Sequence, residues 1–158
     1  MSITLIAAKA ANNCIGKDGQ LPWNIPEDLK HFREITIGKT VLMGRKTWES
    51  IPTKYRPLPG RKNVVVSRDP LFTATGGEVF HDLSEALSIL SKEEVCIIGG
   101  SALFKECLPL AQTIELTQIH AVYEGDTFFP EIDLNEWHVT KREDHNQFSF
   151  LTYKRIPS

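Results

Sequence analysis

The 158-residue sequence has little of what marks membrane, secreted and metal-binding proteins. No segment reaches the run of about 18 apolar residues that a membrane-spanning helix needs. The first residues have no basic stretch ahead of an apolar one, so we expect no secretory signal. Cysteine is scarce, and Cys14, Cys96 and Cys107 are an odd number without metal-ligand spacing. This pattern predicts reduced thiols, a cytoplasmic location and no metal site.

Two further absences narrow the function. The chain has no repeat, low-complexity segment or linker, and 41% of it is apolar, which predicts one domain spanning residues 1–158. It also has neither a G-x-G-x-x-G fingerprint nor a Walker A sequence, the common local signals of dinucleotide and ATP sites. A nucleotide site in this chain would have to use other segments.

The net charge of −2 is small, but the charges are unevenly spread. Residues 45–68 hold seven basic side chains and one acid, a local charge of +6, whereas the rest of the chain sums to −8. A local positive field on an acidic protein favours a small anionic ligand, and the alternative is a solvated basic face. Nucleic acid fits less well, because the chain carries no RNA- or DNA-binding motif.

The apolar pattern predicts a three-layer α/β domain. Short continuous apolar runs are typical of strands covered on both faces of a mostly parallel sheet. Helical patterns lie between them, and a turn-like cluster at 144–146 joins two antiparallel C-terminal strands. About four helices are expected, which start near Pro26, Arg45, Asp82 and Gly100. An eight-stranded sheet is expected from residues 3–8, 40–43, 63–67, 78–80, 95–98, 113–122, 137–142 and 147–153.

The most informative stretch sets Asp28 in the first turn of an apolar helix. Pro26 suits the first helical position, where its missing N–H would be unpaired anyway. Leu29, Phe32 and Ile35 recur at helical spacing, and Asp28 shares the inward face with Phe32. A buried acid without a protein cation needs a ligand donor or a proton, so we expect a raised pKa. The alternative is an ordinary acid at a helix start.

Three predicted strands end in groups suited to phosphate. Gly99 and Gly100 follow one strand and precede a helix, so a ligand can approach the backbone closely and meet free N–H groups. Gly44 ends a second strand ahead of two cations and a hydroxyl, and a third strand ends in Ser67 and Arg68. Because ligands of open α/β sheets bind beyond such strand ends, the three together favour a phosphate site over three unrelated tight turns.

Together these segments resemble dihydrofolate reductases of the bacterial type, in order along nearly the whole chain. The matching segments are 6–8, 15–16, 21–23, 28, 43–51, 58–61, 98–100 and 124–127. The resemblance implies an enzyme of one-carbon metabolism that uses NADPH to reduce 7,8-dihydrofolate, with hydride transfer to C6 and protonation of N5. It also implies a monomer that binds antifolates.

Two alternatives stay open beside that reading. One is the related NADPH-dependent pyrimidine reductase of the riboflavin pathway, against which the pair Trp23 and Asp28 argues. The other is a non-catalytic nucleotide-binding module, which would bind NADPH and turn over no pterin.

The resemblance further implies roles for individual residues. The catalytic group is Asp28, Trp23 and Thr117. In this group the carboxylate of Asp28 accepts paired hydrogen bonds from the pterin. A water molecule donates the proton to N5. The substrate-binding group is Ile6, Ala7, Leu29, Phe32, Ile51, Leu58, Arg61 and Ile98, with the arginine on the glutamate α-carboxylate. The cofactor-binding group is Ala8, Ile15, Gly16, Gly44, Arg45, Lys46, Thr47, Ser67, Arg68, Gly99, Gly100, Ser101, Ala102, Leu103 and Phe104.

Three finer expectations and two departures come from the same resemblance. Arg45, Ser67 and Arg68 match the groups around a 2′-phosphate, which selects NADPH over NADH. The peptide between the glycines at 99 and 100 is expected to be cis. Residues 10–23 are expected to form a mobile loop over the site. Two departures are Phe104, where the family often has tyrosine, and residues 52–57, a longer segment near the substrate entrance.

Overall fold

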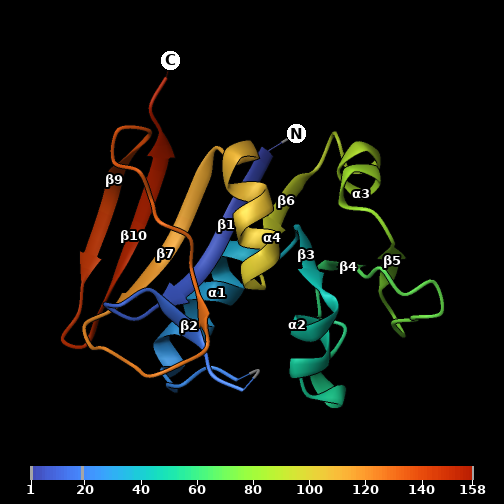
Figure 1. The fold of residues 1–158 in the computed structure, drawn as a ribbon, viewed down its shortest axis with the longest axis horizontal. Coiled ribbons are helices and arrows are strands. Elements are labelled where there is room, and N and C mark those ends of the chain that lie inside the picture. The colour runs from blue at the N-terminus through green and yellow to red at the C-terminus, as the bar shows by residue number, and fades with distance from the viewer. Residues whose placement is uncertain (1, 19, 158) are drawn as a thin grey trace.

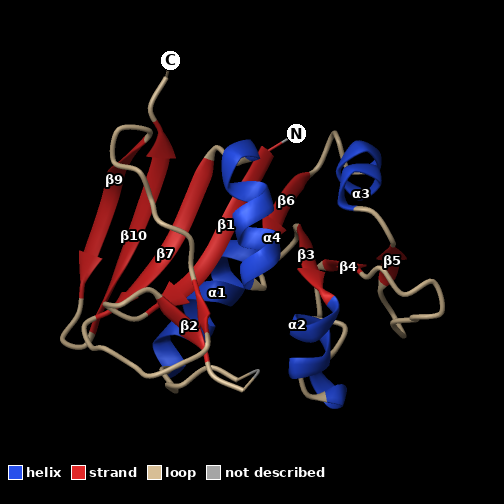
Figure 2. Ribbon diagram, in the orientation of Figure 1, coloured by secondary structure: helices blue, strands red, loops and turns tan. Residues whose placement is uncertain are grey.

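A three-layer α/β arrangement is present in the computed structural model, which describes residues 2–18 and 20–157 (Figures 1 and 2). The central layer is an eight-stranded sheet with the order β5-β4-β3-β6-β1-β7-β10-β9. In that order the strands are β5 (Glu78–Phe80), β4 (Lys62–Val66), β3 (Thr40–Gly44), β6 (Glu94–Ile97), β1 (Ser2–Lys9), β7 (Thr113–Ile119), β10 (Phe148–Arg155) and β9 (Trp137–Asp144). The eight predicted strands are the eight strands of this sheet.

As predicted, the sheet is mostly parallel and its antiparallel pairings involve the C-terminal strands, because β10 runs opposite to the other seven strands. β1 lies between β6 and β7 and runs parallel to both. β10 pairs antiparallel with β7 on one side and with β9 on the other. The sequence predicted a strand over residues 113–122, but the corresponding strand β7 pairs with β10 only as far as Ile119, which is the register partner of Phe148. The chain leaves the sheet after Ile119.

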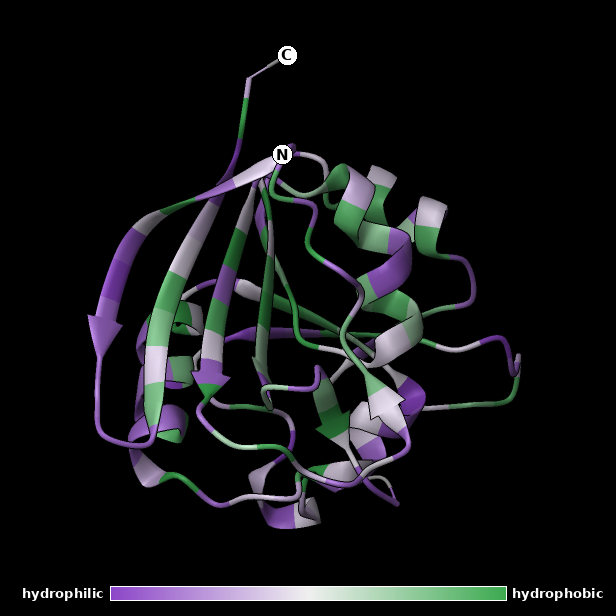
Figure 3. Ribbon diagram, turned by 60° about the vertical axis from the view of Figure 1, so that its left-hand side comes forward, coloured by the Kyte–Doolittle hydropathy of each residue, from purple (hydrophilic) through white to green (hydrophobic). Residues whose placement is uncertain are grey.

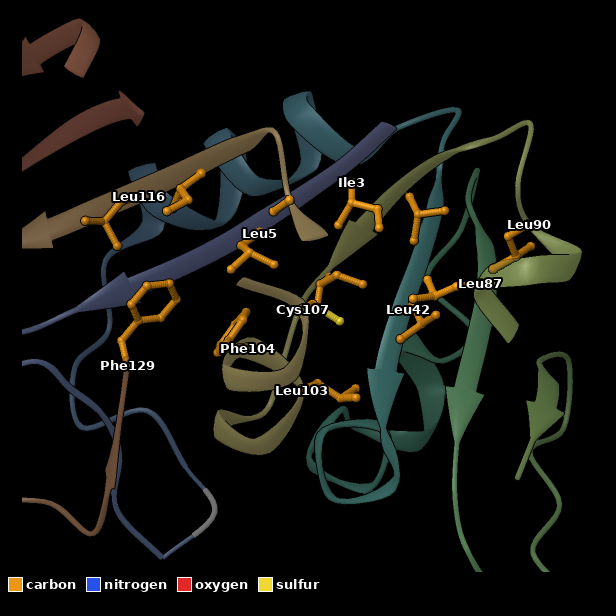
Figure 4. Packing of buried hydrophobic residues seen from close by; sticks show 14 of the residues in the cluster. Ile3, Leu5, Leu42, Leu87, Leu90, Leu103, Phe104, Cys107, Leu116 and Phe129 are labelled. Carbon is orange, nitrogen blue, oxygen red and sulfur yellow. The ribbon is translucent and has the colours of Figure 1, made fainter. Parts of the chain in front are cut away.

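Helices cover both faces of the sheet. The α-helices are α1 (Pro26–Thr36), α2 (Arg45–Ser50), α3 (Leu83–Ile89) and α4 (Ser101–Cys107), joined by the 3₁₀ turns η1 (Thr53–Tyr55) and η2 (Leu108–Leu110). Side chains of α3 and α4 pack on one face against residues such as Leu5 and Leu42 (Figure 4). On the other face, Trp48 of α2 is buried with Ile6 and Val41, and Phe32 of α1 packs against them.

The helices begin where the sequence signals placed them. Pro26 occupies the first turn of α1, where no N–H is missed. The carboxylate of Asp82 caps α3 by accepting a hydrogen bond from the backbone N–H of Glu85 at 3.3 Å. Hydrophilic residues cover most of the edge strand β9 (Figure 3), which discourages pairing with another sheet edge.

A small two-stranded ribbon corrects the expected loop at residues 10–23. β2 (Cys14–Gly16) pairs antiparallel with β8 (Thr127–Phe128), so part of that segment is a strand. A side chain on Gly125 would collide with the sulfur of Cys14 and the carbonyl of Gly16. The segment expected to be a mobile loop is therefore anchored at its centre to residues more than a hundred positions later.

Candidate active site

The acid Asp28 is held by a threonine of the sheet. It lies in the first turn of α1 and is half-buried, and Thr117 of β7 is buried opposite it. The hydroxyl of Thr117 donates a hydrogen bond to Oδ1 of Asp28 at 2.5 Å. The expected meeting of these two side chains, 89 positions apart, is therefore present in the structure.

The surroundings of Asp28 raise the pKa of its carboxyl group. Desolvation raises the pKa of this carboxyl above its usual range, while the Thr117 hydrogen bond and the charge of His31 lower it by smaller amounts. Desolvation prevails because the two lowering effects do not restore the solvation lost by the ionised form. The direction of this shift agrees with the predicted raised pKa.

Apolar side chains of the predicted substrate group gather on the same face of the sheet. Ile6 belongs to the buried cluster there, and Phe32, Ile51, Leu58 and Ile98 pack against it. They come from β1, α1 and three loops, so the fold converges five separate segments on this face.

Two members of that predicted group differ from their neighbours. Leu29 is 59% exposed, because α1 meets the sheet through Phe32 and Ile35 and leaves Leu29 beside them in solvent. Ala7 packs with the cluster under α3 and α4, on the opposite face from Asp28. Its neighbour Ala8 is the register partner of Thr117, so Ala7 can face the Asp28 side only through its backbone.

Trp23 carries an unusual buried donor. Within residues 2–18 and 20–157, its indole Nε1 is buried and meets no hydrogen-bond acceptor. Its ring packs edge-on against Tyr123, with centroids 5.3 Å apart. A buried unpaired donor costs free energy of about 1–3 kcal/mol, which an accepting ligand or water atom relieves.

Arg61 stands at the other end of α1. Its guanidinium donates to the hydroxyl of Thr36 at 3.0 Å and to the carbonyl of Pro59 at 3.0 Å. Desolvation lowers its pKa, and the nearby charge of Arg33 lowers it further. Two guanidinium groups that repel one another favour an anion between them. The contribution of Arg33 was not predicted, because helical spacing alone does not reveal which loop an exposed cation will face.

Two of the three predicted strand ends lie against one another. The N–H of Gly44 donates to the carbonyl of Gly99 at 2.9 Å, and the peptide between Gly99 and Gly100 is cis, as predicted. Gly99 has φ of 125°, a region that side chains disfavour. A Cβ there would also lie 3.3 Å from the hydroxyl oxygen of Thr47. The strand ends form a cradle of bare backbone that side chains would fill.

The predicted cofactor-binding residues of α4, the helix after this cradle, lie partly at the surface and partly in the core. Ser101 and Ala102 begin α4 and are at least partly exposed, next to the cradle. Leu103 and Phe104 are buried, and the ring of Phe104 packs on Phe129 with centroids 5.0 Å apart. Leu103 and Phe104 support the cradle from beneath. A Cβ on residue 99 would lie 3.6 Å from the Phe104 ring, and a Cβ on residue 44 would lie 3.8 Å from Leu103.

The third strand end contributes a cationic corner. Arg45 of α2 pairs with Asp69 at 3.1 Å and with Glu49 at 3.3 Å, and its guanidinium lies over the ring of Phe72. Ser67 is buried and accepts a hydrogen bond from the N–H of Asp69 at 3.2 Å. The residues at 46 and 68 are exposed beside them. The arginine is thus held in place by acids that an incoming anion can displace.

The segment over the site is tied to a distant loop around Asp126. The N–H of Asp18 donates to Oδ2 of Asp126 at 3.0 Å. Gly16 is buried, and its carbonyl accepts from the N–H of Asp126. Ile15 packs against the core under α4. Contacts of this kind bring residues 14–18 and 125–128 together as a unit.

One polar cluster beside this segment has no signal in the sequence. Nζ of Lys9 donates to Oδ1 of Asn13 at 2.6 Å, and Asn13 in turn donates to Glu131 at 3.2 Å. Desolvation lowers the pKa of Lys9, and the charge of Glu131 opposes that shift. From the sequence, a lysine at the end of an apolar strand is expected to lie in solvent. Only the tertiary packing reveals that Lys9 joins a polar cluster.

Three further observations concern the thiols, the possible metal ligands and the lengths of the helices. The three cysteines are free and buried, and burial raises the pKa of Cys96 and Cys107 to about 11. Within the described part of the chain, no group of three or more His, Cys, Asp and Glu side chains is placed to hold a metal ion. No helix among the described residues has the length and apolar character to span a membrane.

Comparison with known proteins gives one consistent result. The sequence model of the dihydrofolate reductase family matches residues 2–155. The dihydrofolate reductase of Neisseria gonorrhoeae is 46% identical over 145 residues, which cover 91% of this chain and 88% of that protein. Dihydrofolate reductase type 3 of Salmonella typhimurium is 51% identical over 146 residues, which cover 92% and 88%.

A solved structure agrees with the sequence relatives. Dihydrofolate reductase from Enterococcus faecalis, complexed with NADP(H) and RAB-propyl, superposes with a TM-score of 0.90 at 37% sequence identity. The superposition covers 99% of this chain and 97% of that one. The likeness therefore extends over the whole sheet and both helical layers.

Proposed function

The chain belongs to the dihydrofolate reductase family, and from this membership we propose which of its side chains carry the reaction. It is an NADPH-dependent oxidoreductase that reduces 7,8-dihydrofolate to 5,6,7,8-tetrahydrofolate. One hydride reaches C6 and one proton reaches N5, and the hydride comes from NADPH when it is bound. The protein binds, orients and polarises, and each of these tasks is assigned below to residues of this chain.

Asp28 is the residue that orients the substrate ring. A carboxylate accepts two parallel hydrogen bonds, which fit the amino group and the adjacent ring nitrogen of a pterin. Thr117 already donates to one of its oxygens at 2.5 Å, which fixes the rotation of the carboxylate before substrate arrives. The desolvation that raises the Asp28 pKa also strengthens its hydrogen bonds to a ligand. This Thr117–Asp28 pair is the observation that carries the assignment.

Trp23 is assigned to the proton side of the reaction. Asp28 binds the far edge of the pterin, so a water beside N5 is the better donor. The buried indole N–H of Trp23 needs an acceptor, and a water oxygen held there would be fixed in orientation. The apolar side chains of Ile6, Phe32 and Ile51 exclude other water from the ring and its aminobenzoyl neighbour. Leu29 and Leu58 extend that surface.

The residues at the strand ends fit NADPH. Bare backbone at Gly44, Gly99 and Gly100 leaves room for a close approach by the pyrophosphate and nicotinamide portions. Ala8, Ile15, Gly16, Ile98, Ser101 and Ala102 are assigned around them. Arg45, Ser67 and Arg68 are assigned to the 2′-phosphate, with Lys46 and Thr47 nearer the pyrophosphate. Leu103 and Phe104 support the cradle from the core.

Arg61 is assigned to the α-carboxylate of the substrate's glutamate. Its planar guanidinium presents two parallel donors, and its repulsion by Arg33 is relieved by an anion. The Enterococcus faecalis relative is complexed with RAB-propyl beside NADP(H), and binding of antifolates is part of the function proposed for this chain. The segment 52–57, which includes η1, lies within a few residues of Arg61 in the chain and shapes the same entrance.

We also propose a single domain over residues 1–158 that acts as a monomer in the cytoplasm. One sheet runs through residues 2–155, and three free, buried thiols suit a reducing compartment. Light scattering of the purified protein at assay concentration tests the monomer, and a mass of about twice 17.8 kDa contradicts it.

A spectrophotometric assay tests the function directly. NADPH oxidation is followed with dihydrofolate and, separately, with the ribosylated pyrimidine of the riboflavin pathway. We expect turnover with dihydrofolate alone and competitive inhibition by an antifolate. Turnover with the pyrimidine alone, or NADPH binding with no turnover of either compound, overturns the assignment.

A further inference from the structure

Two contacts tie the first half of α1 to the sheet. One is the hydrogen bond from Thr117 to Asp28. The other is the ring of His31, which stacks on Phe150 of β10 with centroids 3.8 Å apart and an interplanar angle of 14°. Phe150 is the register partner of Thr117, so the two sheet residues stand in one row across neighbouring strands. Their partners are one helical turn apart, at positions 28 and 31.

Among the residues that the structure describes, few others support the start of α1. The residue ahead of it, Ile25, has an apolar side chain that cannot cap the helix. Leu29 is 59% exposed, and the apolar packing of the helix comes later, through Phe32 and Ile35. The turn that carries Asp28 is therefore held by the two contacts above.

We propose that His31 is a positioning residue for the reaction, whose stack on Phe150 holds the first turn of α1 against the sheet and keeps Asp28 oriented for the pterin. This inference rests on the role proposed above for Asp28. A carboxylate that is displaced by a fraction of an ångström loses the parallel alignment that two hydrogen bonds to one ring require. The position of the first turn of α1 therefore determines how tightly Asp28 binds the substrate.

The surroundings of His31 are rich in charge. A surface pocket of about 690 Å³ lies along α1 and the C-terminal strands. Its charged groups are Glu27, Lys30 and Glu34 of α1, Glu115 of β7, and Lys141 and Glu143 of β9. His145 of the following turn stacks on Phe148 and pairs with Glu143 at 2.7 Å.

His31 also acts on Asp28 through its charge. Three residues separate them on one helix, and a proton on His31 lowers the pKa of the Asp28 carboxyl. The stack and the charge are separable, because phenylalanine keeps an aromatic ring and loses the proton.

Two substitutions separate these effects. His31→Ala removes the stack, and we expect the KM for dihydrofolate to rise about two- to ten-fold, the range for one aromatic pair, with a smaller change in kcat. His31→Phe restores the KM. His31→Phe also removes the charge that histidine carries at low pH, so the Asp28 titration, read by carboxyl ¹³C NMR of the ligand-free protein, moves to higher pH.

His138 provides the control. It is an exposed histidine of the neighbouring strand β9, in register with Lys154, and its charge does not contribute to the pKa of Asp28. His138→Ala and His138→Phe are expected to keep the wild-type KM and the wild-type Asp28 titration. Thermal melts of all four variants separate loss of folding from loss of position.

Several outcomes decide the matter. The proposal is overturned if His31→Ala keeps the wild-type KM, if His31→Phe fails to restore it, or if the His138 variants produce the same changes. The NMR titration reads Asp28 without turnover. Absence of dihydrofolate reduction by the wild-type protein would therefore refute the proposed function while the titration still tests the inference.

Discussion

Replacing Asp28 by asparagine isolates the charge of one carboxylate. The change keeps the size of the side chain and an oxygen that Thr117 can reach, since their present contact is 2.5 Å. It replaces the second oxygen by an amide that donates where the substrate also donates. Two hydrogen bonds to a charged group, each worth about 1.5–3 kcal/mol, are lost or weakened. We therefore expect kcat/KM to fall about 10²- to 10⁴-fold.

The same substitution is expected to stabilise the ligand-free protein at neutral pH. The folded-state pKa of Asp28 is raised, chiefly by desolvation, so the folded protein binds this proton more tightly than the unfolded chain does. The stability that the group contributes is complete below the unfolded pKa and is lost as pH rises through the folded pKa. Asparagine removes that loss, so the variant melts at a higher temperature at pH 7 and gains nothing in strong acid.

The assay needs three measurements and one control. Steady-state NADPH oxidation gives kcat/KM, fluorescence titration gives the NADPH affinity, and calorimetry at pH 7 and in acid gives the melting temperatures. Glu27→Gln is the control, because it changes an adjacent, exposed acid in the same way. We expect it to retain wild-type kinetics, and NADPH affinity to be nearly unchanged in both variants. An Asp28→Asn enzyme within tenfold of wild type, or an equal loss in Glu27→Gln, would refute the reasoning.

Three further changes test other parts of the structure. Arg45→Ala with Arg68→Ala is expected to weaken NADPH much more than NADH in equilibrium titrations, because only the former has a 2′-phosphate, and an equal loss contradicts a phosphate site. Thr117→Val removes a donor to the carboxylate, so the pKa of Asp28 rises and the acid limb of the kcat/KM profile moves to higher pH. Thr113→Val, on the same strand but bonded to a lysine, should leave that limb in place. Asp82→Ala removes the cap of α3 and should lower the free energy of unfolding by about 1 kcal/mol in urea titrations without changing kinetics. Unchanged stability there would contradict the cap.

Local patterns were sufficient for most of the fold. Continuous apolar runs identified the strands, and Pro26 and Asp82 marked helix starts at which the structure has α1 and α3. These signals are local because a strand covered on both faces requires consecutive apolar residues, and a helix start requires particular residue types at its first positions. The β2–β8 ribbon escaped prediction. Its strands are two and three residues long and more than a hundred positions apart, so neither has a period to detect.

The site divides in the same way. The sequence alone placed an acid in a helix start and glycines after strands, because these follow from residue type and spacing. It could not decide which face a neighbour would take: Ala8 lies in register with Thr117, whereas Ala7 packs on the opposite cluster. A period of two residues makes that choice depend on the register between strands. That register exists only once the sheet has formed.

The amino-acid sequence by itself therefore determined the helices, the strands and the resemblance to a family of reductases. Only the tertiary structure decided that Thr117 would reach Asp28, that His31 would stack on Phe150, and that Leu29 would stay in solvent. The physical reason is distance along the chain. A hydrogen bond between residues 28 and 117 has no local signal, because it is created by the packing of a helix on a strand that forms far from it in sequence.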